Sequence, residues 1–206
     1  GRRTPTAIER GIIDRLMTET EQTRALAFRE RVAVHIESAE RIAASLSEQI
    51  TDEDVEDTRA LYTALGLLAP DLDVRHMLED VLGEQVVGYY DPEGKRLVVR
   101  DDVMHLLVSR GRTPEALMAK LTLLHELVHA LQDQHLDLEA RYDDETMSTD
   151  RGFAFRCVAE GDAMLAMIVN AAELTGRDVR DAVQQVLQQP VDMNNLTSGG
   201  AGDGLG

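Results

Sequence analysis

The spacing of apolar residues constrains the fold of this chain more than any other feature. From Thr6 to about Ile50 apolar residues recur every three or four positions, as they do on one face of an amphipathic helix. Residues 86–100, VVGYYDPEGKRLVVR, change instead to the pattern of two short strands around an Asp-Pro-Glu-Gly turn. We therefore predict a predominantly helical α+β fold with a small antiparallel hairpin at 86–100.

Capping residues and helix breakers place the other helices. Thr113 and Pro114 supply an N-cap and a first-turn proline for a long helix, and Gly176 follows the last residue of another. We expect these further helices over residues 51–66, 72–82, 102–110, 113–136, 150–175 and 178–189. We also expect two domains, an N-terminal helical region (1–82) and a second domain (83–206) whose abrupt end suggests a cut before another element.

The motif HELVH, at residues 125–129, lies in the middle of the helix predicted over 113–136. On a helix, residues four apart differ by about 40° around the axis, so His125 and His129 can bind the same metal ion. Glu126 beside them can take a proton from a metal-bound water without binding the ion itself. The motif therefore predicts a metal site; the alternative is a pair of histidines on an ordinary helix.

A catalytic zinc usually has three protein ligands, and two residues compete for the third position. His135 has the spacing of the metzincin signature, but Gln132 replaces that signature's glycine, and six residues of continuous helix rotate His135 about 240° away. Glu160, in VAEGDAML, lies on the next long helix, and Gly161 would allow that helix to approach closely. We expect Glu160 to be the ligand, and His135 to lie near the helix end, where it meets the C-terminal dipole or caps a carbonyl. Asp162 either orients a ligand histidine or faces solvent.

Three segments together resemble a known family: HELVHALQDQH, the later EGDA, and the preceding GEQVVGYYDPEGKRLVV. They are similar to bacterial gluzincin-type zinc metallopeptidases of the zincin-like fold. The resemblance implies that Zn²⁺ is bound by His125, His129 and Glu160, that Glu126 is the general base, and that a peptide or protein substrate is hydrolysed. It also implies that an edge strand of a small sheet, formed by the hairpin, holds the extended peptide by main-chain hydrogen bonds.

The resemblance leaves two roles open. Met164 stands where thermolysin-like gluzincins have an acidic residue, so the partner of the zinc-binding histidines is not assigned. Tyr89, Tyr90 and Tyr142 could each donate a hydrogen bond to a developing oxyanion, although a tyrosine on a hairpin more often packs against its neighbours.

Net charge and hydropathy argue against some classes of partner. A formal net charge of −17 disfavours nucleic acid, which is bound through a basic surface. No apolar run approaches the ~20 residues of a membrane span. The chain opens with GRRTPT and no Met, which suggests a processed or cut form. Removal of an upstream signal or anchor would fit an extracytoplasmic protein, but the sequence leaves the compartment open. We expect the single cysteine, Cys157, to be a small buried residue.

Two other functions fit the sequence. In the first, the chain is a non-catalytic module with a structural zinc site, and the helical region from Thr6 to Leu82 binds a partner protein. In the second, that helical region covers the cleft of a peptidase and regulates it. A closed fourth coordination position would favour the non-catalytic module.

Overall fold

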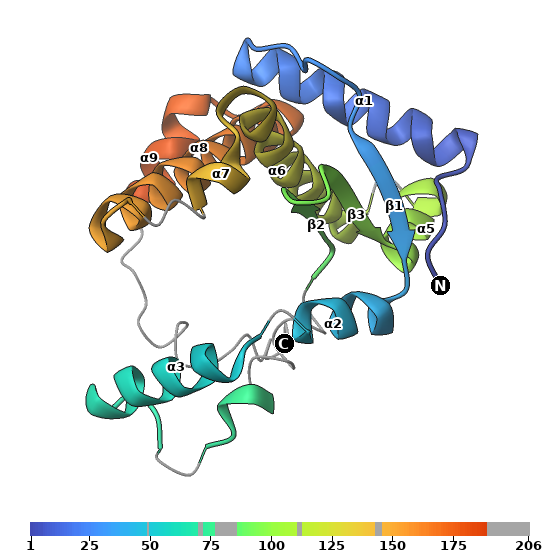
Figure 1. The fold of residues 1–206 in the computed structure, drawn as a ribbon. Coiled ribbons are helices and arrows are strands. Elements are labelled where there is room, and N and C mark those ends of the chain that lie inside the picture. The colour runs from blue at the N-terminus through green and yellow to red at the C-terminus, as the bar shows by residue number, and fades with distance from the viewer. Residues whose placement is uncertain (49, 70–71, 77–85, 111–112, 143–145, 189–206) are drawn as a thin grey trace, which may run out of the picture. The chain divides into compact units, whose positions relative to one another are not determined.

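The computed structural model of this chain describes residues 1–48, 50–69, 72–76, 86–110, 113–142 and 146–188 (Figure 1). The chain divides into two compact units, one of Gly1–Ser38 with Val87–Val186 and one of Ala39–Val86 with Leu187–Gly206. The domain boundary that we predict between residues 82 and 83 lies outside the described residues, as does most of the helix predicted over 72–82.

Most of the first unit is helical. Its helices and strands are α1 (Ala7–Arg24), β1 (Ala33–Glu37), β2 (Gly88–Asp91), β3 (Arg96–Arg100), α5 (Asp101–Arg110), α6 (Pro114–Leu136), α7 (Leu138–Tyr142), α8 (Thr149–Thr175) and α9 (Val179–Gln188) as far as Val186. The second unit contains α2 (Ala39–Ser47) and α3 (Asp52–Ala64). The predicted caps of the two long helices are confirmed: the Thr113 side chain accepts from the Ala116 amide, and Gly176 ends α8 with a left-handed conformation.

The sheet is larger than the predicted hairpin. β2 and β3 pair antiparallel as expected, but β1 adds to the other side of β3 in parallel, giving a mixed sheet of order β1-β3-β2. β1 lies where we predict a helix, and His35 lies on this strand rather than on a helix face. The prediction failed because Val34 and Ile36 also satisfy a period of two, and a short apolar run does not distinguish strand from helix.

The N-terminal residues attach α1 to the outer edge of β1. The main chain of Arg3 forms two hydrogen bonds with Ile36, at 2.9 and 2.8 Å. The Arg3 guanidinium bonds both carboxylate oxygens of Glu9 at 2.8 Å, and Glu9 also completes a capping box with Thr6 at the start of α1. Hydrogen bonds from Arg3 hold the pKa of Glu9 far below its usual range, at about 2. Helix α1 and the sheet are therefore joined before the chain reaches the second unit.

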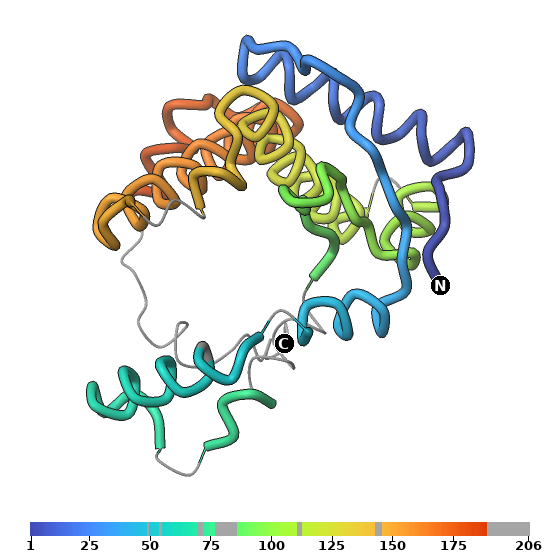
Figure 2. The backbone as a smooth tube through the Cα atoms, viewed as in Figure 1, coloured from blue at the N-terminus to red at the C-terminus, as the bar shows by residue number. Residues whose placement is uncertain are grey.

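Helix α6 is buried on two sides, and Figure 2 shows it between the sheet and α8. On one side Leu123 and Leu127 join the main core, which also takes residues from α1, α5, β1 and β3. On another side Leu124 and Val128 pack against alanines of α8. The core side chains of the main cluster are Ile13, Leu16, Met17, Val32, Val34, Ile36, Leu97, Val99, Val103, Met104, Leu107, Ala116, Ala119, Leu123, Leu127 and Ala130. Burial on both sides makes α6 a rigid support.

Two predictions about α8 are wrong. Cys157 is exposed, and Gly161 does not permit a close approach, because a methyl group there would meet no atom within 4 Å. Both follow from the rotation of the helix: α8 turns Ala159, Ala163 and Ala166 inward, and Cys157 and Gly161 fall on the opposite side.

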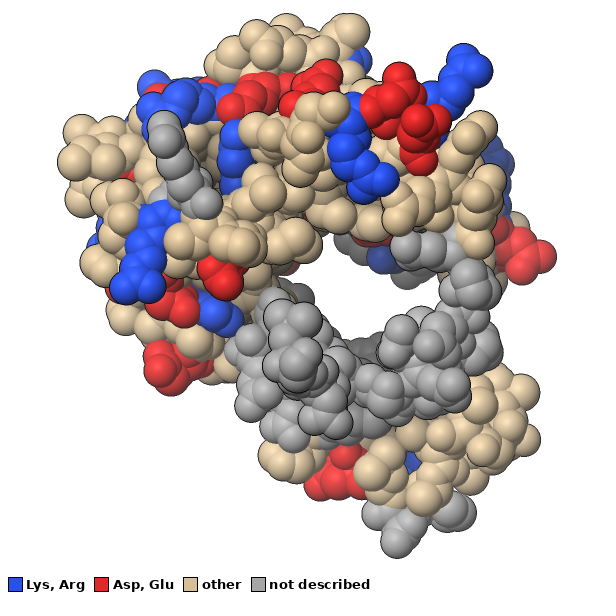
Figure 3. Space-filling view, turned by 180° about the vertical axis from the view of Figure 1, so that it is seen from behind, with Lys and Arg blue, Asp and Glu red and all other residues tan. Residues whose placement is uncertain are grey.

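On the face drawn in Figure 3, basic and acidic side chains are interspersed among other residues. The ion pairs between described residues include Arg31 with Asp14 and Lys120 with Glu19. None of the helices within the described ranges has the length and apolar content needed to cross a membrane.

Gly88 packs too closely against neighbouring backbone to carry a side chain. A Cβ at Gly88 would lie 2.6 Å from the Val98 carbonyl oxygen and 3.1 Å from Leu123 Cδ2, so β2 can approach β3 and α6 only without a side chain here. We expect Gly88→Ala to lower the free energy of unfolding by about 1–3 kcal/mol, as overpacking does. Gly161→Ala, the matched control, should be neutral or raise it by up to ~1 kcal/mol. Urea denaturation measures both; equal effects would contradict this role of Gly88.

Candidate metal centre

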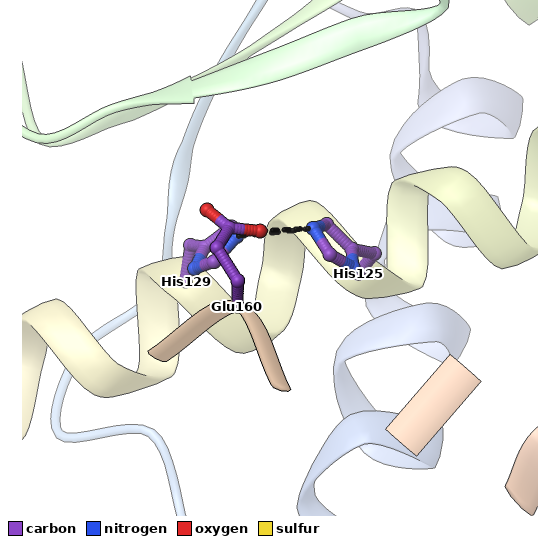
Figure 4. Close-up of side chains that lie close together, drawn as sticks. All are labelled: His125, His129 and Glu160. Carbon is purple, nitrogen blue, oxygen red and sulfur yellow. Dashed lines mark hydrogen bonds and ion pairs between the residues drawn. The ribbon is translucent and has the colours of Figure 1, made fainter. Parts of the chain in front are cut away.

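Three side chains from two helices converge on one point (Figure 4). His125 and His129 come from α6, and Glu160 reaches across from α8. The two imidazole Nε2 atoms are 3.1 Å apart, and Glu160 Oε2 lies 3.3 Å from His125 Nε2 and 3.4 Å from His129 Nε2. Among the residues that the structure describes, these three form the group that could hold a metal ion.

The donor atoms are spaced as a tetrahedral ion requires. With bonds of about 2.0–2.1 Å, as zinc forms to nitrogen and carboxylate oxygen, tetrahedral ligand atoms lie about 3.3–3.4 Å apart. The three separations found here, 3.1, 3.3 and 3.4 Å, are close to this value. Two imidazoles and one carboxylate are also a ligand set typical of catalytic zinc. The donor set therefore fits such an ion without rearrangement of the helices.

Burial favours the neutral form of His125, which is the form that binds metals. The side chains of His125 and His129 are 15% and 11% exposed, whereas that of Glu160 is 57% exposed. Burial, followed by the charge of His129, lowers the pKa of His125, while the Glu160 carboxylate acts in the opposite direction. Deprotonated imidazoles bind a metal without first releasing a proton.

Glu126 faces the same cavity and is held by the sheet. Its Oε2 accepts a hydrogen bond of 3.0 Å from the backbone amide of Tyr90, on β2. Burial raises the pKa of Glu126, and the Tyr90 amide partly offsets this. The cavity has a volume of about 260 Å³, and its lining residues are Tyr90, Pro92, His125, Glu126, His129, Leu138, Tyr142 and Glu160.

The Tyr90 hydroxyl is committed elsewhere. It donates to Asp133 over 2.7 Å, and Asp133 also accepts from Lys95 at 3.1 Å and from the Leu138 amide at 2.8 Å. Tyr90 therefore fixes β2 to α6 twice, through its amide and through its hydroxyl. Of the three candidate oxyanion donors, Tyr142 lines the cavity with the metal-binding group, while Tyr89 is not among the cavity-lining residues.

Gln132, at the position of the metzincin glycine, is the partner of His129. His129 Nδ1 lies 3.0 Å from Gln132 Oε1 in a buried contact. Gln132 Nε2 in turn donates to the Ala159 carbonyl at 3.0 Å and to Asp162 Oδ2 at 2.9 Å. Asp162, the candidate to orient a histidine, thus reaches His129 through Gln132.

His135 lies away from His125, His129 and Glu160. Helix α6 continues without a break to Leu136, and His135 Nε2 makes a hydrogen bond of 3.0 Å with the carbonyl of Ala27. His135 thus lies near the end of α6, as predicted, but the carbonyl that it bonds belongs to the segment after α1. In this structure it is Glu160, not His135, that lies beside His125 and His129.

The chain matches none of the protein-family models, curated proteins or solved structures with which it was compared. The resemblance to gluzincins, over about residues 65–166, stays an expectation drawn from the motifs.

The sequence contains signals for some of the residues that we missed. Gln132 stands three residues after His129, and on a helix that spacing places two side chains on one face. Asp133 stands four residues after His129, and this spacing also places the two side chains on one face of the helix. No sequence signal marks the backbone amide of Tyr90 as a hydrogen-bond donor to the site, because every residue except proline has a backbone amide.

Glu160 and His135 can be separated by metal binding. We expect the purified chain to hold one zinc ion. Glu160→Ala should lose the zinc or bind it far more weakly, because only two of the three proposed ligands remain. His135→Ala should keep the zinc, because His135 bonds the Ala27 carbonyl and not the metal. Elemental analysis after dialysis measures the stoichiometry. Loss of zinc in His135→Ala but not in Glu160→Ala would contradict the assignment. A wild-type chain that holds no zinc even after reconstitution would also contradict it.

Proposed function

We propose that this chain is a zinc-dependent metallopeptidase of the gluzincin type, with a zincin-like fold. One observation carries the proposal: His125, His129 and Glu160 place their donor atoms within 3.4 Å of one another, and Glu126 lines the same cavity. Peptides or proteins would be the substrates.

The coordination supports a catalytic rather than a structural site. A structural zinc normally has four protein ligands, whereas the group found in the described part of the chain has three. These three border a cavity of about 260 Å³, and Glu160 is more than half exposed. An open position beside a cavity is what a hydrolytic site needs for water and substrate. This favours a peptidase over a non-catalytic module.

A bound zinc would polarise the scissile carbonyl and lower the pKa of a water molecule. Glu126 would take up the proton at Oε1, because Oε2 is held by the Tyr90 amide, and would pass it to the leaving amine. Its raised pKa brings this carboxyl closer to neutral pH, where a general base is most effective. The amide of Tyr90 also keeps the carboxylate from rotating toward the ligands.

The extended substrate would lie along β2. The sheet order β1-β3-β2 leaves β2 at an edge, and its residue Tyr90 lines the cavity. The edge of β1 is by contrast occupied by the bridge between Arg3 and Ile36. An edge strand beside the catalytic group can align a peptide by main-chain hydrogen bonds.

Removal of the general base should separate catalysis from metal binding. Glu126→Gln keeps an acceptor for the Tyr90 amide but cannot take up a proton, so we expect kcat to fall by ~10³-fold or more. Zinc content should be unchanged, because Glu126 is not a ligand. Cleavage of unfolded proteins, followed by mass spectrometry of the products, measures the rate. Persistent cleavage by this variant would exclude Glu126 as the base.

Tyr142 is the tyrosine best placed to stabilise the oxyanion. It lines the cavity with the ligands, and its ring is held by Arg156, whose Cζ lies 4.2 Å from the ring centroid, and by an edge contact with Phe155. Burial raises the pKa of Tyr142, and the charge of Glu160 adds to the effect. The hydroxyl therefore stays protonated and can donate.

Tyr142→Phe keeps the ring contacts and removes only the hydroxyl. We expect kcat to fall by ~100-fold with zinc content unchanged, as for the loss of one oxyanion donor. Tyr89→Phe is the matched control, because Tyr89 is not among the cavity-lining residues, and it should retain activity. Steady-state kinetics measures both variants. A loss confined to KM, or an equal loss in Tyr89→Phe, would speak against this role.

A further inference from the structure

We propose that Gln132 is a positioning residue that couples the zinc ligand His129 to an ion pair between two other helices, Asp162 of α8 and Arg24 of α1. The affinity for zinc would then depend on a contact outside the metal site. This inference rests on the proposed zinc site and adds to it the means by which the chain orients a ligand.

The orientation of the Gln132 amide is fixed by its partners. Its nitrogen faces the Ala159 carbonyl at 3.0 Å and Asp162 Oδ2 at 2.9 Å, and both of these atoms only accept hydrogen bonds. Its oxygen must therefore face His129 Nδ1, at 3.0 Å. Gln132 is 7% exposed, so these bonds have little competition from water.

This arrangement selects one tautomer of His129. Because Gln132 Oε1 can only accept, Nδ1 of His129 carries the proton, and in the neutral ring Nε2 keeps a free lone pair. Nε2 is the atom that faces His125 and Glu160. Gln132 thus presents His129 to a metal in the form that binds one.

The ion pair completes a continuous chain of contacts. Asp162 uses Oδ2 for Gln132 and Oδ1 for Arg24, which lies in the last turn of α1. The side chains of Arg24 and Asp162 are 30% and 27% exposed, so both can be replaced without opening the core. Met164 cannot provide a carboxylate partner for a ligand histidine. Asp162, acting through the side-chain amide of Gln132, takes that place.

Zinc affinity, measured by competition with a chelator, distinguishes positioning from simple packing. We expect Gln132→Met, which fills a similar volume, to bind zinc ~10–100-fold more weakly than the wild type. Asp162→Ala should weaken binding by a smaller factor. The double variant should bind no more weakly than Gln132→Met alone, because Asp162 acts only through Gln132.

Glu19→Ala is the matched control. Glu19 pairs with Lys120 at 2.9 Å, so this variant removes an ion pair that also anchors α1 but does not touch the site. Its zinc affinity should equal that of the wild type. A loss of affinity here would show that any weakening of α1 has the same effect, and it would overturn the inference.

Two other results would overturn the coupling. One is a folded Gln132→Met variant that binds zinc as tightly as the wild type. The other is a double variant, Gln132→Met with Asp162→Ala, whose loss of zinc affinity equals the product of the two single losses. If Gln132→Met does not fold, Arg24→Ala and Asp162→Ala give the same test, since their combination must bind like Asp162→Ala alone. A wild-type chain that binds no zinc would instead overturn the proposed function itself.

Discussion

The burial of α6 on two sides is the constraint on which the site depends. Leu123 and Leu127 lock the helix into the core with the sheet, while Leu124 and Val128 lock it against α8. Because both contacts are close-packed, the helix cannot rotate without opening one of them. The two histidines of HELVH therefore point into the space between the sheet and α8, where Glu160 meets them.

Polar contacts from successive turns of α6 refine this placement. Toward the sheet, Glu126 and Asp133 hold the amide and the hydroxyl of Tyr90. Toward α8, Gln132 joins His129 to Asp162. These contacts orient the side chains around the site, whereas the Nδ1 atom of His125 is buried without a hydrogen-bond partner among the described residues.

Much of the fold could be read along the chain because the signals are local. The caps at Thr113 and Gly176, the hairpin turn and the helical periodicity of the long helices all depend on near neighbours in the sequence. β1 was missed because five residues fit both periods, and what makes them a strand is β3, far along the chain. The same limit explains Cys157 and Gly161, whose exposure depends on how α8 is rotated against α6.

By itself the sequence determined which residues could bind a metal, since residues four apart on one helix must share a face. It could not determine their partners. The approach of Glu160, the capture of Glu126 by the Tyr90 amide and the contact of Asp162 with Gln132 join segments that only packing brings together. The sequence gives the chemistry of each side chain, whereas the distances between helices depend on how the whole core packs.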